Sequence, residues 1–216
     1  SMSADETLDA IEEIRGLTNE QCLLSGMSAV VTDIKKICNS EVIMYVVIAA
    51  GLSALVLALT MDSFLLPFIF LLSIGMAIVY NLGTNFIAGE ISFVTQALAA
   101  VLQLAVTMDY SIFLWHSYLE NQERYPDDRK RAMSHAISQT LTSVVGSSIT
   151  TIAGFLAMCF MTFTLGMDLG IVMAKGVVLG ILTVIFVLPA VVLLFEKQII
   201  KYRHRSFVPD FTRLNK

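Results

Sequence analysis

Five long apolar segments constrain the fold of this chain more than any other feature of its sequence. They lie at about 43–60, 65–82, 92–116, 136–161 and 169–195, and charged residues, glycines or turn residues bound each one. A helix needs about 20 apolar residues to cross a bilayer. Because 56% of the residues are hydrophobic and only 15% are charged, the sequence predicts an all-α, polytopic membrane protein with five transmembrane helices.

A polar N-terminal segment precedes the first apolar run. Its apolar residues recur at helical spacing over 8–17, which predicts a short amphipathic helix ending near Gly16. A second helix is expected to begin near Ala29 and to continue into the first span. We therefore divide the chain into a polar segment (1–42), a five-helix membrane domain (43–196) and a basic tail (197–216).

Basic residues are unevenly distributed between the two sides of the predicted bundle. Most of them lie in the loop 117–135 and in the tail. By the positive-inside rule, this loop and the C-terminus are expected in the cytoplasm, with the N-terminal segment outside. The loop has the pattern of an amphipathic helix on the inner membrane surface. Because no export signal precedes the polar segment, we expect an upstream helix and external domain in a longer protein. A natural half-size protein is the alternative.

Asp109 is a single carboxylate in the middle of the third apolar segment, and Tyr110 follows it directly. An ionised Asp at the centre of a membrane helix costs about 2.5–3.5 kcal/mol on insertion scales, so such residues usually have a function. We expect Asp109 to carry a proton and Tyr110 to orient its carboxyl group. Both are predicted on the side of the helix that faces the bundle, with Gln103. A permanently satisfied structural Asp is the alternative.

Other polar and small residues in the spans are weaker candidates. Lys175 is expected to differ from Asp109 in height by roughly 10–15 Å, from the helical rise per residue, so a direct ion pair is not expected. It either supports proton transfer, contacts Asp168 or reaches the membrane surface. The fourth segment contains hydroxyl groups on Ser147, Thr150 and Thr151. They either allow close packing between helices or extend the proton path. Five glycines are predicted to allow close helix contact: Gly146, Gly154, Gly170, Gly176 and Gly180.

Several functions have no support in the sequence. There is no nucleophile motif, phosphate-binding loop or dinucleotide fingerprint, so no enzyme is predicted. There is also no metal-ligand spacing and no basic patch with interleaved aromatic residues, so neither a metal nor a nucleic acid is expected. Cys159 is expected to be a core residue. Whether Cys22 and Cys38 pair is left open, because spacing alone does not establish a disulfide.

Four motifs, in this order, resemble one protein family. They are TMDYSIFL (107–114), GSSITTIAGFLAM (146–158), GMDLGIVMAKGVVLG (166–180) and LPAVV (188–192). Together they resemble helices two to six in one half of a transporter of the RND superfamily, in its MMPL branch. The resemblance covers about 41–205 and favours the N-terminal half. It implies that 1–42 is the C-terminal remnant of an external porter-type domain.

The resemblance also implies a function. Such proteins export lipids or other amphiphiles at the expense of the proton gradient, without a cofactor, and the Asp109–Tyr110 pair would relay protons. The expected location is the bacterial cytoplasmic membrane. The expected partners are membrane lipids, an amphiphilic substrate, and the second half and external domain of the same protein; a homo-oligomer is left open. A sterol-sensing module, which resembles the same five-helix block, is the main alternative, and the Asp-Tyr pair argues for transport. An accessory protein-translocation subunit is a third possibility.

Overall fold

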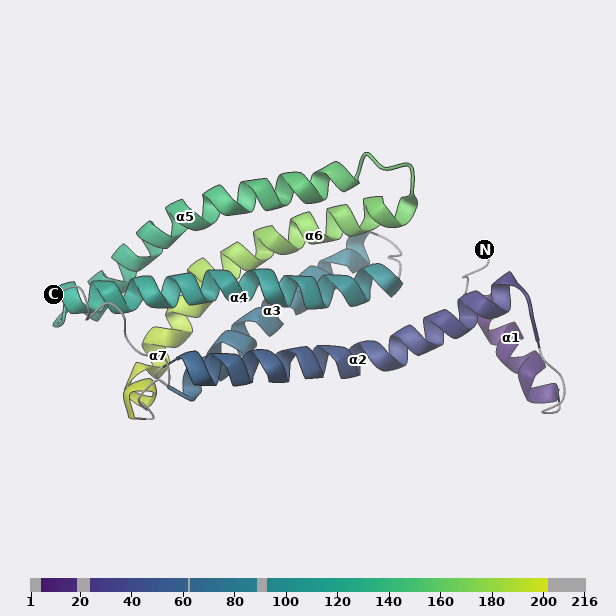
Figure 1. Cartoon of the computed structure of the whole chain (residues 1–216), viewed down its shortest axis with the longest axis horizontal. Helices are drawn as coiled ribbons and strands as arrows, with labels where there is room; N and C mark the ends of the chain where they lie inside the picture. Colours follow the sequence, from purple (N-terminus) through teal and green to yellow (C-terminus); the bar gives the residue numbers. More distant parts are fainter. Residues whose placement is uncertain (1–4, 19–23, 62, 89–92, 202–216) are drawn as a thin grey trace. The chain divides into compact units, whose positions relative to one another are not determined.

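The structure, a computed structural model, describes residues 5–18, 24–61, 63–88 and 93–201 (Figure 1). All regular elements in these residues are helical. They are α1 (Asp5–Leu17), α2 (Met27–Thr60), α3 (Leu65–Ala88), α4 (Phe93–Arg124), α5 (Arg129–Met158), α6 (Thr164–Leu182), the π-helical turn η1 (Thr183–Val187) and α7 (Leu188–Lys201). Five helices are long and apolar enough to cross a membrane, with α6, η1 and α7 contributing one continuous span. The predicted all-α fold with five spans is confirmed.

The prediction that the loop 117–135 forms a separate helix on the membrane surface is wrong. Helix α4 continues to Arg124 and α5 begins at Arg129, so only four residues connect them. The side chain of Asp128 caps α5 by accepting a hydrogen bond from the backbone N–H of Arg131 at 3.0 Å. The charged residues of this region, apart from Asp127 and Asp128 in the connection, therefore lie on the ends of two long membrane helices. Polar residues on a helix that extends beyond the bilayer give the same amphipathic pattern as a helix lying on its surface.

The chain divides into two compact units, residues 1–46 and 47–216. In the first unit, two ion pairs link α1 to the first turns of α2. The guanidinium of Arg15 donates to both carboxylate oxygens of Asp33, at 2.5 and 2.8 Å. Lys36 Nζ donates to Glu12 Oε1 at 2.8 Å. Helix α1 ends at Leu17, one residue after the predicted end, and the continuous α2 begins two residues before Ala29.

The contact between Glu12 and Lys36 is expected to depend on pH. The hydrogen bond from Lys36 lowers the pKa of Glu12 below its ordinary value of 4.5. The contact therefore stabilises the fold fully above pH 4.5 and is lost as the pH falls through the lowered pKa. We expect Lys36→Gln to reduce the melting temperature slightly at pH 7 and not at pH 2. An equal reduction at both pH values would contradict this origin of the stabilisation.

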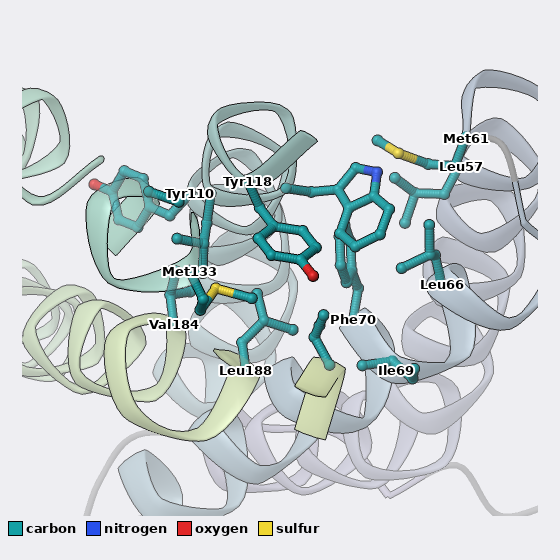
Figure 2. Packing of buried hydrophobic residues seen from close by; sticks show 14 of the residues in the cluster. Leu57, Met61, Leu66, Ile69, Phe70, Tyr110, Tyr118, Met133, Val184 and Leu188 are labelled. Carbon is teal, nitrogen blue, oxygen red and sulfur yellow. The ribbon is translucent and has the colours of Figure 1, made fainter. Parts of the chain in front are cut away.

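In the second unit, α4 packs against α3, α5 and α6, and α3 also packs against α6 and α7. The apolar core lies where α3, α4, η1 and α7 meet, and the end of α2 joins it through Leu57 and Met61. Figure 2 shows the ring of Tyr118 among Phe70, Met133 and Leu188. Tyr118 is only 1% exposed. The large side chains of this core thus gather toward the end of the bundle that carries the α4–α5 connection.

A buried carboxylate ties α4, α5 and α7 together at this same end. Glu196 accepts a hydrogen bond from the hydroxyl of Tyr118 at 3.0 Å, and its second oxygen lies 3.0 Å from Arg129 Nη1. Glu196 is 7% exposed. A buried carboxylate is stable when it has both a cation and hydrogen-bond donors. These contacts fix the end of α7 against the α4–α5 hairpin.

Removal of this carboxylate is expected to destabilise the bundle. Glu196→Ala leaves the buried Tyr118 hydroxyl without its acceptor and Arg129 without its ion pair. We expect a loss of about 1.5–3 kcal/mol in the free energy of unfolding, the typical value for hydrogen bonds to charged groups. The matched control is Glu120→Ala, which removes an exposed i,i+4 pair with Arg124 and is expected to cost about 0.3–0.5 kcal/mol. Equal losses in the two variants, measured by denaturant unfolding in detergent, would contradict the prediction.

The last span contains a π-helical turn, η1, at residues 183–187. The backbone N–H of Leu188 donates to the carbonyl of Thr183, five residues back, where an α-helix would use the carbonyl four residues back. The next residue, Pro189, has no N–H and would clash with a carbonyl in the preceding turn of a regular α-helix. The wider turn accommodates this proline without ending the helix.

Candidate functional site

Asp109 lies on an exposed face of α4 in this five-helix unit. Leu98, Leu102 and His116, at helical spacing from Asp109, are exposed as well. The prediction that Asp109 and Tyr110 both face the bundle is therefore wrong for Asp109. Consecutive residues of a helix point about 100° apart, as 3.6 residues per turn requires, so Asp109 and Tyr110 can lie in different environments. Tyr110 and Gln103 face inward, and Asp109 does not.

Tyr110 connects α4 to α5. Its side chain is 5% exposed, and its hydroxyl lies 3.0 Å from Ser148 Oγ. Ser148 also donates to the carbonyl of Val144 at 2.6 Å. A serine hydroxyl has one proton, so both contacts are satisfied when Tyr110 donates to Ser148 and Ser148 donates to Val144. The residue after Asp109 is thus held in place by a buried hydrogen bond between helices.

The other predicted hydroxyl groups of α5 bond to their own helix. Ser147 donates to the Val144 carbonyl, while Thr150 and Thr151 both donate to the Ser147 carbonyl, at 3.0, 2.7 and 3.1 Å respectively. Ser147 and Thr150 are exposed in this unit. A role of Ser147, Thr150 and Thr151 in a proton path stays a prediction. Ser148, which is not among these predicted residues, is an α5 hydroxyl that contacts α4.

A buried polar seam joins α3, α4 and α6. Asn81 Nδ2 donates to Gln103 Oε1 at 2.8 Å and to the Val172 carbonyl at 3.3 Å, and Gln103 Nε2 donates to the Gly176 carbonyl at 3.3 Å. Asn81 and Gln103 are 0% and 1% exposed. Hydrogen bonds of this kind join helices at membrane depth. Sequence reasoning missed Asn81, although its spacing of four from Asn85 places both residues on one face of α3.

Lys175 projects from α6 toward α3 and donates a hydrogen bond to Asn85 Oδ1. Asn85 is 4% exposed and Lys175 is partly exposed. Within the described residues, Lys175 forms no ion pair with Asp109 or Asp168. Its partner is an amide on a neighbouring helix, which the sequence did not identify.

The predicted glycines occupy two kinds of environment. A Cβ added to Gly170 would lie 2.5 Å from the Phe155 carbonyl oxygen, and one added to Gly176 would lie 2.7 Å from Asn81 Nδ2. At Gly180 the corresponding distance, to Thr107 Oγ1, is 2.6 Å. Gly146 and Gly154 have nothing within 4 Å of an added Cβ. The close contacts of α6 with α3, α4 and α5 therefore use three of the four glycines of α6, and the two glycines of α5 lie on an open face.

The described residues contain no group of three or more His, Cys, Asp or Glu side chains able to hold a metal ion. His135 stacks on Tyr125, with ring centroids 5.1 Å apart.

Cys159 is a partly buried free thiol close to Gly170. Cys22 and the side chain of Cys38 lie outside the described part of the chain, so their pairing stays open.

Comparison with known proteins identifies the family. Residues 1–207 match the MMPL family model. The chain is 32% identical over 146 residues to the Streptomyces coelicolor protein ActII-3. The aligned residues are 66% of this chain and 20% of the relative. It is 26% identical to SCO5905 of the same organism over 209 residues, 92% of this chain and 25% of the relative. Both relatives are named as membrane proteins.

A relative from an archaeon extends the comparison. The Methanocaldococcus jannaschii protein MJ1562 is 33% identical over 99 residues, which are 45% of this chain and 25% of the relative. The chain thus spans about a fifth to a quarter of the length of the curated relatives it matches. No solved structure matches it significantly. The family match covers almost the whole sequence and agrees with the five-span fold, so this chain belongs to the MMPL family of membrane proteins.

Proposed function

We propose that this chain is part of the membrane domain of an RND-type exporter that uses the proton gradient to move lipids or other amphiphiles. The observation that carries the proposal is the position of Asp109, a carboxylate in the middle of a membrane-spanning helix and next to a firmly held tyrosine. Ionisable residues at membrane depth usually belong to ion or proton pathways. Asp109 is the residue proposed to bind and release the proton.

Tyr110 has a positioning role in this proposal. Its hydrogen bond to Ser148 fixes the rotation of α4 against α5, and with this rotation Asp109 lies on an exposed face of α4. The chain covers only about a fifth to a quarter of its relatives. We therefore propose that a further membrane segment of the intact protein covers the Asp109 face and supplies the partner of the carboxylate.

The energetics support coupling through a single carboxylate. Burial against another segment would penalise the ionised form of Asp109, whereas a nearby cation or hydrogen-bond donor would favour it. A conformational change that exchanges these surroundings would load and release one proton per cycle. The membrane potential supplies about 2.3 kcal/mol per charge for each 100 mV, which is enough to bias a two-state equilibrium by more than tenfold.

The test is a proton flux measurement on the intact protein in liposomes loaded with a pH-sensitive dye. Under an imposed pH gradient, we expect proton movement above that of protein-free liposomes, and faster movement when a fluorescent amphiphile is present as substrate. Absence of proton movement together with saturable sterol binding would overturn the proposal and favour the sterol-sensing alternative. Proton movement without any response to amphiphiles would restrict the proposal to proton conduction.

A further inference from the structure

Lys175 and Asn85 form a polar pair at the end of the bundle that carries the α3–α4 connection. Asn85 lies three residues beyond the predicted apolar segment 65–82, close to the end of α3 at Ala88. The amine of Lys175 reaches this level because the long lysine side chain extends from α6 and donates to Asn85 Oδ1. The pair thus places a positive charge just beyond the predicted apolar segment of α3.

The amide of Asn85 has an unused donor beside this charge. Asn85 is 4% exposed, and its Nδ2 has no hydrogen-bond partner among the described residues. The orientation of the amide follows from its neighbour, because an ammonium group donates only and requires the oxygen of the amide to face it. The NH₂ group is therefore left as a buried donor without an acceptor, which is uncommon in folded proteins.

The charge of Lys175 also lacks an anionic partner in the described part of the chain. The ion pairs there involve Arg15, Lys36, Arg124 and Arg129, and none includes Lys175. After its bond to Asn85, the ammonium keeps two further N–H donors. Cation and amide together present only donors, and this composition matches an anion with several acceptor oxygens.

We propose that Lys175 and Asn85 bind the anionic headgroup, a phosphate or a carboxylate, of a lipid or other amphiphile. The headgroup would accept a hydrogen bond from the partly exposed Lys175 ammonium and, as the Lys175 side chain moves aside, from the buried Asn85 Nδ2. The apolar chains would lie along the exposed side chains of α6. Ile171 and Val178, four and three residues from Lys175, are exposed on the same face of that helix. The site does not depend on proton transfer at Asp109.

The test is lipid binding to the purified chain in a neutral detergent, followed by native mass spectrometry. The probes are phosphatidylglycerol, which is anionic, and phosphatidylcholine, which has no net charge. We expect the wild-type chain to bind phosphatidylglycerol more tightly. Lys175→Gln is expected to weaken this binding about tenfold, as expected for loss of a charge-assisted hydrogen bond, and to leave phosphatidylcholine binding unchanged.

Two further variants make the test independent of folding defects. Asn85→Asp keeps the shape of the side chain but places a carboxylate against Lys175, which neutralises the ammonium internally and removes the free NH₂ donor. It is expected to fold and to lose the preference for phosphatidylglycerol. Lys130→Gln removes one positive charge from the exposed start of α5 and is expected to bind as the wild type does.

Three results would overturn the proposal: equal binding of the two lipids by the wild-type chain, wild-type preference in Asn85→Asp, or an equal loss in Lys130→Gln. Competition with inorganic phosphate identifies the source of the anionic group. Displacement of phosphatidylglycerol by millimolar phosphate supports a site that recognises the anion alone. Failure to displace it, with dependence on Lys175 retained, supports a site for the intact amphiphile. Because proton flux is not measured, these outcomes are separate from those for the proposed function.

Discussion

Replacing Asp109 by Asn in the intact protein is expected to reduce proton flux in liposomes to the level of protein-free liposomes, with normal membrane insertion and folding. The substitution changes one oxygen for an NH₂ group and keeps the size of the side chain, so packing is unaffected. The amide cannot bind and release a proton. Asp109 is exposed in the five-helix unit, so the stability of this unit is expected to be close to that of the wild type.

The control for this experiment is Asp168→Asn, which removes a carboxylate near the beginning of the last span. Asp168 lies near the beginning of α6 and has no proposed part in the relay. It is expected to retain proton flux. Equal flux in Asp109→Asn and the wild type would disprove the role of Asp109, whereas loss of flux in both variants would indicate a general requirement for negative charge in the spans.

Gly170→Ala is expected to destabilise the bundle, because position 170 has no room for a methyl group. The added methyl group would lie 2.5 Å from the backbone oxygen of Phe155, 3.0 Å from Cys159 Sγ and 3.3 Å from the Met158 side chain. A backbone oxygen within a helix cannot turn away, so α5 and α6 must separate. We expect a loss of about 1–3 kcal/mol in the free energy of unfolding, the usual cost of overpacking a core.

The matched control is Gly154→Ala in α5. No atom lies within 4 Å of the methyl group that this substitution adds. Alanine is favoured over glycine in a helix by about 0.8–1 kcal/mol, so Gly154→Ala is expected to be neutral or stabilising in the isolated chain. The same chemical change should thus have opposite signs at two positions. Thermal unfolding in detergent measures both, and a destabilised Gly154→Ala with an unaffected Gly170→Ala would contradict the packing described for α6.

The number and type of membrane helices could be predicted from the sequence, because an apolar run of about 20 residues has few alternatives in a bilayer. Helix ends were less predictable. Helix α5 begins at Arg129, seven residues before the predicted apolar segment, because a capped polar helix can extend beyond the membrane without any change in apolar composition. Apolar content defines the part of a helix that lies in lipid, whereas caps and turns define the helix itself.

The candidate site was only partly predictable. The sequence identified Asp109 and Tyr110 as unusual, but it could not show that the two face opposite environments, because periodicity alone does not say which stripe of α4 contacts its neighbours. The partners of Lys175 and Tyr110 were also missed. Asn85 and Ser148 are short polar residues on other helices, and their contacts depend on how the helices pack.

The π-helical turn adds one residue to the last span without changing where the following side chains point. A π turn contains one more residue than an α turn for the same rotation about the axis. Deletion of one residue within 183–187 would therefore restore a regular α-helix and leave the residues after it in nearly the same direction, so that Glu196 would still face Tyr118 and Arg129. A deletion elsewhere between Lys175 and Glu196 would instead rotate Glu196 relative to Lys175 by about 100°. Sequences that differ in length by one residue at this turn can thus share the same inward-facing residues on both sides of it.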